Sequence, residues 1–170
     1  MAGGKGSRMG GAEKPLLAPC GKPLLLQVLE ALRPFCREIL VVTSPKAPLT
    51  RSLCPSLGVE CVEGSGDYVS DLNMVLTPPF PLLVLPSDLP FLEPEVLGEF
   101  LKAGEDMPYP VVNLAGPAGP SGISLFKSWG GEWGDVRLEN YSLIDIDTWE
   151  EYWRAVEMCE RTAGGRRRES

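Results

Sequence analysis

The sequence predicts an α/β fold built around a mostly parallel sheet. Continuous apolar runs at residues 38–43 and 80–85 are typical of strands that are buried on both faces, as parallel strands are. Segments with apolar residues three and four positions apart separate these runs and predict amphipathic helices. Strands and helices that alternate in this way favour a sheet covered by helices, with ligands bound at the carboxyl ends of its strands.

The chain has the size and composition of one globular domain. Its 170 residues fit the usual range for a single domain, and 44% of them are hydrophobic. We place this domain at residues 1–163. The run Arg166–Arg168 follows two glycines and predicts a flexible basic tail over residues 164–170.

Charge and residue usage exclude several classes of function. The net charge of −7 argues against a nucleic-acid partner. The absence of histidine excludes a His-based catalytic triad and leaves lysine, arginine and carboxylates for chemistry. Five cysteines, an odd number without C-x-x-C spacing, argue against a disulfide framework or a zinc site. With neither a signal peptide nor a long apolar run, the sequence predicts a cytoplasmic protein that does not span a membrane.

The first half of the chain alternates between helices and strands. Residues 23–32 predict a helix that ends before Pro34, and residues 38–43 predict a buried strand. Residues 48–57 predict a short helix and residues 58–62 a short strand. The strand at 38–43 leads into a Ser-Pro turn, which places a loop at its carboxyl end.

The middle of the chain continues this alternation. A flexible loop is expected at residues 63–67, followed by a helix at 68–77 with one apolar stripe. Residues 80–85 predict a strand that runs directly into Ser87 and Asp88. A further helix is predicted at residues 94–103, where apolar residues recur at helical spacing.

The last third of the chain has a different pattern. Residues 110–114 and 123–126 predict strands joined by a Gly- and Pro-rich loop, and another short strand is expected to end at 143–146. Thr148 and Glu151 have the spacing of a capping box, so the last helix is predicted to begin there.

The glycine-rich start of the chain has the features of a phosphate-binding loop. Five of its first eleven residues are glycine, which lets the backbone approach a ligand closely and point several N–H groups at one anion. Arg8 and Lys14 add two cations that can contact phosphate oxygens. The spacing fits neither the dinucleotide-binding fingerprint, which needs glycine where Met9 stands, nor a Walker A motif, which needs a final Gly-Lys-Ser/Thr.

The same stretch resembles a signature of the nucleotidyltransferases that activate a phosphate or sugar phosphate with a nucleoside triphosphate, A-G-G-x-x-x-R-M-G followed by K-P. Residues 2–10 and 14–15 match it without a gap, and the molybdenum-cofactor guanylyltransferases share it. The chain is more similar to the archaeal GTP:adenosylcobinamide-phosphate guanylyltransferases, which carry a G-G-x-E-K-P-L continuation like residues 10–16. Further likenesses are Cys20-Gly21, Thr43-Ser44-Pro45, Asp71-Leu72-Asn73, Ser87-Asp88-Leu89 and Gly122-Ile123.

This resemblance implies a fold, a reaction and partners. It implies a three-layer Rossmann-like nucleotidyltransferase fold and a homodimer. The implied reaction transfers GMP from GTP to adenosylcobinamide phosphate and releases pyrophosphate, a step of cobalamin nucleotide-loop assembly. Family members have an apolar strand directly before the glycine loop, whereas this sequence starts at the loop. We therefore expect a sheet that lacks its first strand or is truncated there, and we favour a native segment upstream of Met1.

The resemblance and the expected sheet place a site at one rim. Asp88, after the strand at 80–85, is the candidate ligand of a Mg²⁺ cofactor, although its position also suits a helix cap. With Arg8 on the departing phosphates and Lys14 at the α-phosphate, we expect Arg8, Lys14 and Asp88 to be catalytic. The expected nucleotide-binding residues are Ala2, Gly3, Gly4, Lys5, Gly6, Ser7, Arg8, Lys14, Thr43, Ser44, Asp71 and Asn73, and Gly122 is expected on the acceptor side.

Several alternatives stay open. The chain could instead be a guanylyl- or cytidylyltransferase that acts on molybdopterin or a sugar phosphate, or a non-catalytic nucleotide-binding protein. Asp71 and Asn73 could contact the base or ribose, or could be no more than exposed polar groups of a helix. Asp145 or Asp147 could supply a second carboxylate to the metal.

Overall fold

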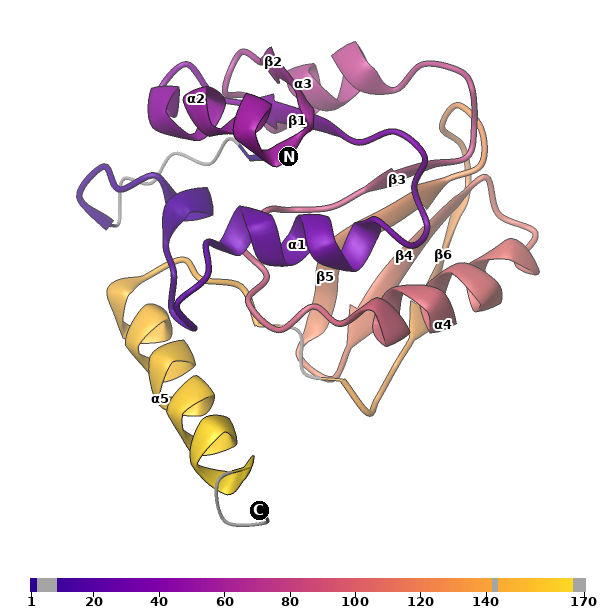
Figure 1. Ribbon diagram of the computed structural model, residues 1–170. Helices are drawn as coiled ribbons and strands as arrows, with labels where there is room; N and C mark the ends of the chain where they lie inside the picture. The colour runs from indigo at the N-terminus through magenta and orange to yellow at the C-terminus, as the bar shows by residue number, and fades with distance from the viewer. Residues whose placement is uncertain (3–8, 142–143, 167–170) are drawn as a thin grey trace.

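The computed structural model describes residues 1–2, 9–141 and 144–166, with side chains as far as Arg161. Residues 3–8 of the predicted phosphate loop and 167–170 of the predicted tail lie outside the described residues. The elements in chain order (Figure 1) are η2 (Lys14–Leu16), α1 (Leu24–Leu32), β1 (Leu40–Thr43), α2 (Pro48–Leu57), β2 (Glu60–Glu63), α3 (Tyr68–Val75), β3 (Leu82–Val84), α4 (Pro94–Glu105), β4 (Val111–Gly116), β5 (Gly119–Phe126), β6 (Trp133–Arg137) and α5 (Trp149–Arg166).

Local sequence explains where the helices begin and end. α1 follows Pro23, and α2 begins with Pro48, whose fixed φ suits the first turn of a helix. Gly58 ends α2 in the left-handed conformation, with a φ of 67° that favours glycine. The Asp67 side chain caps α3 by accepting a hydrogen bond from the Ser70 amide at 2.9 Å.

α5 begins as its capping box predicts. The Thr148 amide donates to the Glu151 carboxylate at 2.8 Å, and the Glu151 amide donates to the Thr148 hydroxyl at 3.2 Å. The helix extends away from the body of the molecule (Figure 1) and continues to Arg166, so residues 164–166 of the expected tail are helical. It packs on the body through a buried cluster of Met9, Leu24, Ile146 and Ala155.

The strands form two sheets rather than one. β1 and β2 pair in parallel, and the other four strands form a sheet in the order β3-β5-β4-β6. β5 runs antiparallel to β3 and β4, whereas β6 runs parallel to β4. The α/β class is confirmed, but the sheets are mixed where a mostly parallel sheet was expected. The cause is local, because the two residues 117–118 join β4 to β5 by a turn too short for a parallel crossover.

The end of the larger sheet differs from the prediction. β6 lies in a Trp- and Gly-rich segment that the sequence did not mark as a strand, since glycine is uncommon in strand interiors. The strand predicted at 143–146 is not formed by its described residues 144–146. Ile146 is fully buried and its amide donates one hydrogen bond to the Asp88 carbonyl at 3.2 Å. The apolar residues of this segment therefore serve packing rather than strand pairing.

α1 and α4 cover one face of the four-stranded sheet (Figure 1). Phe100 and Leu97 of α4 are fully buried with Val112 of β4, and burial of such side chains contributes about 1.5–3 kcal/mol each. Gly104 permits a close approach of α4 to this sheet, since a Cβ there would lie 3.4 Å from a Val112 methyl group. This packing holds β3 in place and so fixes the position of the loop that carries Asp88.

Met1 and Ala2 lie between the two sheets. The Met1 amino group donates to the Leu85 carbonyl at 2.8 Å, and the Ala2 amide donates to the Val42 carbonyl at 2.7 Å. Ala2 also forms a parallel bridge with Thr43 of β1. Among the described residues, this short stretch is the only chain between β1 and β3, so the expectation of a Rossmann-like sheet truncated at its first strand is confirmed.

The expectation that the cysteines form no disulfides is wrong. Cys20 is bonded to Cys159 with a Cα–Cα distance of 5.5 Å, and Cys54 to Cys61 with 6.1 Å, while Cys36 is a free thiol. Both distances lie within the usual range for disulfides. The odd count is explained by the one free cysteine. Sequence spacing could not predict the first pair, because folding brings together cysteines that are 139 residues apart.

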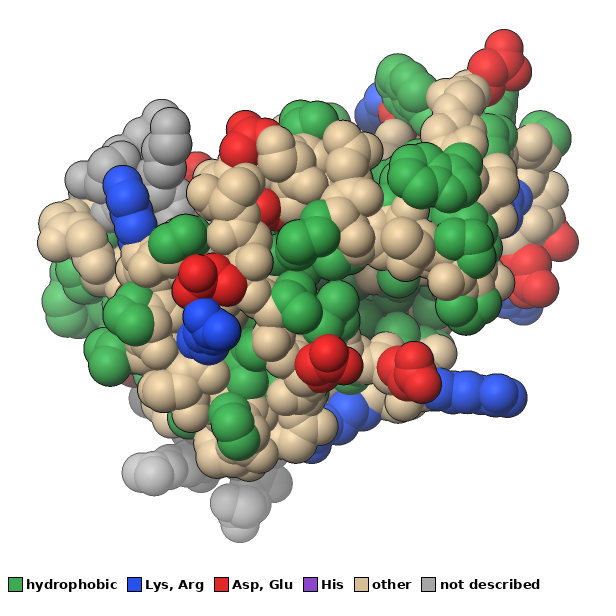
Figure 2. Space-filling view, turned by 90° about the horizontal axis from the view of Figure 1, so that it is seen from above, with side chains coloured by type: hydrophobic (Ala, Val, Ile, Leu, Met, Phe, Trp, Pro, Cys, Tyr) green, Lys and Arg blue, Asp and Glu red, His purple; other side chains and the backbone are tan. Residues whose placement is uncertain are grey.

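The surface agrees with the acidic composition. On the face seen in Figure 2, Lys and Arg side chains lie singly among acidic and apolar ones and form no basic field of the kind that binds nucleic acid. In the described part of the chain, no helix is long and apolar enough to cross a membrane.

Candidate active site

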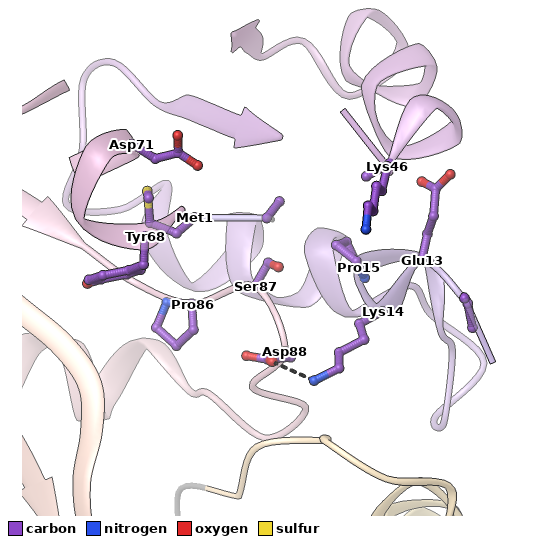
Figure 3. A pocket seen from close by; sticks show the side chains of 14 residues that line it. Met1, Glu13, Lys14, Pro15, Lys46, Tyr68, Asp71, Pro86, Ser87 and Asp88 are labelled. Carbon is purple, nitrogen blue, oxygen red and sulfur yellow. Dashed lines mark ion pairs between the residues drawn. The ribbon is translucent and has the colours of Figure 1, made fainter. Parts of the chain in front are cut away.

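A cavity of about 210 Å³ opens where the loops that follow β1 and β3 meet the turn that carries Lys14. The position agrees with the expectation that ligands bind off the carboxyl ends of strands. Its lining residues (Figure 3) are Met1, Ala2, Gly11, Ala12, Glu13, Lys14, Pro15, Lys46, Ala47, Tyr68, Asp71, Pro86, Ser87 and Asp88.

Lys14 lies between two carboxylates. Its ammonium group donates a hydrogen bond to the Asp147 carboxylate. It also lies 3.8 Å from Asp88 Oδ2, the ion pair that Figure 3 marks with a dashed line. The Lys14 side chain is 14% exposed, against 21% for Asp88 and 43% for Asp147. Three segments far apart in the sequence thus bring one cation and two anions together beside the cavity, which Lys14 and Asp88 line.

The Asp88 carboxylate is in an unfavourable environment for its charge. Burial is the main cause that raises its pKa, and the negative charges of Asp145 and Asp147 raise it further, while the Lys14 ammonium acts in the opposite direction. The net effect is a raised pKa. A cation bound beside Asp88 would therefore stabilise its ionised form.

The carboxylates near Lys14 fit a divalent ion that arrives with a nucleotide. Asp88 and Asp147 approach the same ammonium group, so both carboxylates can reach one cation position. The described residues contain no group of three or more His, Cys, Asp or Glu side chains able to enclose a metal. Mg²⁺ commonly takes one or two carboxylates and completes its shell with phosphate oxygens and waters. The donors present match that coordination.

Glu13 ties the turn that carries Lys14 to the start of α2. Its carboxylate accepts hydrogen bonds from the Leu49 amide at 2.9 Å, and from both the amide and the hydroxyl of Thr50 at 2.6 Å. Burial alone would raise the pKa of Glu13, but these bonds together lower it. Sequence reasoning included Glu13 only as part of a motif and missed this anchoring contact.

Asp71 lines the cavity, but its carboxylate is engaged by the neighbouring loop. It accepts from the Ser65 amide at 2.5 Å, from the Ser65 hydroxyl at 2.9 Å and from the Gly66 amide at 3.2 Å, and the residue is 3% exposed. A Cβ at Gly64 would lie 2.5 Å from this carboxylate, so the loop packs directly on it. The contact of Asp71 with a nucleotide stays a prediction, and the geometry favours a role in holding the loop.

Ala2, a predicted nucleotide-binding residue, lines the cavity, but Thr43, Ser44 and Asn73 do not. Thr43 is fully buried and its hydroxyl donates to the Val62 carbonyl at 3.2 Å, while the Ser44 hydroxyl accepts from the Lys46 amide at 3.0 Å. Asn73 is exposed on α3 and is not among the lining residues. Lys46, just after the Ser-Pro turn, lines the cavity in their place and adds a cation that sequence reasoning missed.

Two further predictions concern Gly122 and the glycine loop. Gly122 has a φ of 77°, and a Cβ there would lie 3.3 Å from the Pro86 ring, so it lies behind a lining residue rather than in the cavity. Residues 3–8, which include Arg8, lie outside the described residues. Tyr68, at the first position of α3, lines the cavity and was missed, because an aromatic residue at a helix start carries no sequence signal for a site.

The family model of the MobA-like NTP transferase domain matches residues 1–128. That segment holds most of the chain, including Lys14 and Asp88. The chain belongs to the MobA-like NTP transferase family. The matched domain ends just after β5, so β6, Asp147 and α5 lie beyond the segment that the family model describes.

Enzymes that transfer guanylyl groups are among the relatives of this MobA-like chain. The adenosylcobinamide-phosphate guanylyltransferase of Methanocaldococcus jannaschii is 36% identical over 111 residues, which are 59% of this chain and 56% of the relative. The molybdenum cofactor guanylyltransferase of Acidovorax sp. is 33% identical over 110 residues, which are 61% of this chain and 50% of the relative. The chain therefore spans about half the length of these relatives.

Solved structures share the fold at low sequence identity. Rv0371c from Mycobacterium tuberculosis has a TM-score of 0.72 at 18% identity, covering 92% of this chain and 95% of that chain. Its complex with manganese has a TM-score of 0.67 at 16% identity, covering 85% and 91%. Molybdopterin-guanine dinucleotide biosynthesis protein A from Archaeoglobus fulgidus has a TM-score of 0.67 at 20% identity, covering 94% and 96%. These likenesses confirm the predicted nucleotidyltransferase fold of the MobA-like chain.

Proposed function

We propose that this chain is a nucleotidyltransferase that transfers GMP from GTP to a phosphorylated acceptor, with adenosylcobinamide phosphate as the acceptor. The observation that carries the reaction class is the contact of Lys14 with both Asp88 and Asp147 beside the cavity that Lys14 and Asp88 line. The likeness to the adenosylcobinamide-phosphate guanylyltransferase of Methanocaldococcus jannaschii supports the choice of acceptor.

The proposed reaction is a substitution at the α-phosphorus of GTP. A phosphate oxygen of the acceptor forms a new bond to that phosphorus, and the bond to the oxygen that bridges to the β-phosphate breaks. Pyrophosphate leaves with this electron pair. The acceptor phosphate is already ionised at neutral pH, so the reaction needs positioning and charge neutralisation rather than a general base. A chain without histidine is compatible with that demand.

In this proposal, Lys14 neutralises charge on the reacting α-phosphate. Its ammonium has three donors, so it can contact a phosphate oxygen while it keeps a carboxylate partner. Lys46 adds a second cation to the cavity lining. Arg8 and the backbone of residues 2–7 hold the β- and γ-phosphates in this proposal, and the backbone of the turn after Thr43 contacts guanine.

Asp88 and Asp147 are the residues that would hold a divalent cation, for which we propose Mg²⁺. A divalent ion supplies charge neutralisation and orientation of the triphosphate. The raised pKa of Asp88 supports this assignment, because a carboxylate kept in an unfavourable environment gains most from a bound cation. The manganese complex of the structural neighbour supports a divalent ion in this fold.

A homodimer and a cytoplasmic location belong to the same proposal. The resemblance to the guanylyltransferases supports the dimer, and the use of GTP supports an intracellular compartment. Light scattering on the purified chain tests the dimer, and a monomeric mass would contradict it. Export of the native protein from its host cells would contradict the location.

Pyrophosphate release under matched nucleotide and acceptor panels tests the function. We expect release with GTP and adenosylcobinamide phosphate in the presence of Mg²⁺, and none when ATP, CTP or UTP replaces GTP. Equal release with ATP would contradict guanylyl specificity. Nucleotide binding without release under every acceptor would contradict an enzyme and favour a non-catalytic nucleotide-binding protein.

A molybdopterin acceptor is the second candidate. The 33% identity to the molybdenum cofactor guanylyltransferase of Acidovorax sp. favours it. The same assay separates the two functions, because release with molybdopterin but not with adenosylcobinamide phosphate would replace the acceptor and keep the reaction class.

A further inference from the structure

Two links join η2 and the turn after it to the region of α5. Lys14, in η2, donates a hydrogen bond to the Asp147 carboxylate just before α5. Further along the same turn, Cys20 is bonded to Cys159 within α5. The Asp147 amide also donates to the Glu151 carboxylate at 2.8 Å, in the first turn of α5. The disulfide and the ion pair therefore hold the same two segments together.

Apolar packing contributes little to the attachment of α5. Among the described side chains of this helix, only that of Ala155 is buried, and it is one of the smallest apolar side chains. Trp149 and Trp153 are 43% and 60% exposed, and the helix extends away from the body of the molecule (Figure 1). Apolar stabilisation scales with the area removed from water. The disulfide is therefore a main attachment of α5.

The two disulfides differ in access and in surroundings. Cys20 is exposed, whereas Cys54 is 1% exposed, and thiol–disulfide exchange needs a sulfur that a thiolate can reach. Cys54 lies in α2 and Cys61 in β2, which β1 holds by pairing, so their thiols stay close together after reduction. Cys20 and Cys159 are 139 residues apart and stay close only while α5 is attached. A thiol reductant should therefore open the bond to α5 selectively.

We propose that the bond between Cys20 and Cys159 is a redox-sensitive link that controls whether Asp147 stays beside Lys14. A thiolate of a dithiol reductant attacks Cys20 Sγ, and the electron pair of the S–S bond leaves on Cys159, which takes up a proton. The second thiol of the reductant then attacks the mixed disulfide and releases Cys20 as a thiol. The products are two protein thiols and one disulfide of the reductant.

Opening of this link acts on the charged groups beside the cavity. Release of α5 loosens Asp147, because the Asp147 amide is bonded to the first turn of that helix. Lys14 then loses one carboxylate partner, keeps Asp88 and becomes more exposed. Only the consequence for catalysis rests on the proposed function: the reduced protein should need more Mg²⁺ for GMP transfer, because one of the two carboxylates assigned to the cation moves away. The effect on Lys14 itself does not depend on that function.

Chemical labelling of the nucleotide-free protein, read by mass spectrometry, tests the proposal. The purified chain is treated with increasing concentrations of dithiothreitol. An alkylating reagent then labels free thiols, and an acylating reagent labels lysine side chains. Lys22, exposed and paired with Glu30, is the reference for the reagent. Lys127, whose ammonium donates to the Gly104 carbonyl at 3.1 Å at the end of α4, reports general unfolding.

We expect dithiothreitol to release the thiols of Cys20 and Cys159 before those of the other disulfide. Over the same range, acylation of Lys14 should become about fivefold faster, since its side chain is only 14% exposed while the link is closed and local opening uncovers it. Acylation of Lys22 and Lys127 should not change. The proposal is overturned if the two disulfides open together, or if Lys127 reacts faster along with Lys14.

Two variants separate a change transmitted through Asp147 from general loosening. Cys20→Ser should acylate at Lys14 as fast as the reduced wild type and should not respond to dithiothreitol. Asp147→Ala should acylate fast from the start and gain little on reduction. An equal acceleration at Lys14 in the wild type and in Asp147→Ala would overturn the proposal. Absence of GMP transfer from every form would contradict the proposed function and would leave these labelling results unchanged.

Discussion

Lys14 is the residue on which the proposed chemistry depends most, because it lines the cavity and its ammonium contacts the carboxylates of both Asp88 and Asp147. Substitution Lys14→Ala should lower the turnover of GMP transfer by about 100-fold or more, the usual effect of removing one preorganised charge-stabilising donor. Pyrophosphate release under saturating GTP measures it. The control is Lys22→Ala, which removes an exposed lysine paired with Glu30. Equal turnover in the two variants would remove Lys14 from the mechanism.

Asp88 should show its role through the pH dependence of stability. A carboxyl whose pKa is raised on folding contributes stability below its unfolded pKa and loses that contribution as the pH rises through its folded pKa. Without metal, Asp88→Asn should therefore melt higher than the wild type at neutral pH, and the difference should narrow as the pH falls. Thermal melts of both proteins from neutral to acidic pH measure the difference in melting temperature and how it narrows.

The response to metal ions distinguishes a metal-binding role of Asp88 from a role as a turn residue alone. Mg²⁺ should raise the melting temperature of the nucleotide-bound wild type more than that of Asp88→Asn, and wild-type turnover should fall as acid protonates Asp88. The control is Asp106→Asn, at the exposed end of α4. An Asp88→Asn variant with the Mg²⁺ dependence of the wild type would leave Asp88 as a turn residue only.

Glu13 is predicted to act as a positioning residue. Glu13→Gln replaces charge-assisted bonds to the start of α2 with neutral ones, which should cost about 1–2 kcal/mol and lower the melting temperature by about 2–6 °C. Because the pKa of Glu13 is lowered on folding, the loss should be complete at neutral pH and should shrink as the pH falls through the folded pKa. The matched control is Glu30→Gln on the exposed face of α1, and equal shifts in both variants would contradict the anchoring role.

At the scale of single residues, the sequence predicts the residues whose position follows from a motif or from the end of a strand. Lys14 and Asp88 both line the cavity as predicted. Thr43 does not line the cavity, and its hydroxyl bonds to β2, while Asp71 lines the cavity but its carboxylate bonds to the neighbouring loop. These partners depend on side-chain geometry that spacing does not encode. Asp147 joins Lys14 from a distant segment, so no local pattern could pair the two residues.

At the scale of elements, α5 is held to the turn that follows η2 by the bond between Cys20 and Cys159. Asp147 lies just before α5, so this link also supports the carboxylate beside Lys14. Cys20→Ser should destabilise the fold by about 2–4 kcal/mol, as loss of a disulfide that closes a long loop does. Cys36→Ser is the control, since Cys36 is a free thiol. Titration of five free thiols in the unreduced, unfolded chain would contradict the bond.

The helices were predictable from sequence to within a few residues, because apolar stripes, prolines and caps define them locally. α1, α2 and α4 begin within about one residue of their predicted starts. β6 and the segment at 144–146 were not predictable, because strand formation there depends on an edge that a distant strand offers. The antiparallel course of β5 follows from a short turn that the alternation of helices and strands does not reveal.

At the scale of the whole molecule, two sheets meet at one rim, where a cavity is lined by residues from the start of the chain as far as Asp88. Asp147, from the last third of the chain, joins this rim through Lys14. Because the net charge is −7, the electrostatic field of the whole protein does not attract a triphosphate. A few local cations near the cavity must attract it instead. Membership of the MobA-like family and the contacts of Lys14 with Asp88 and Asp147 both support nucleotidyl transfer.

Transfer of label from the α-phosphate of GTP tests the central claim most directly. The chain is incubated with Mg²⁺, adenosylcobinamide phosphate and GTP labelled at the α-phosphate, and the products are separated by chromatography. We predict that the label moves to the cobinamide product with one pyrophosphate released per transfer, and that Lys14→Ala slows this movement by about 100-fold or more. Label that stays in GTP, or that appears only as GDP or GMP without a cobinamide product, would contradict the account.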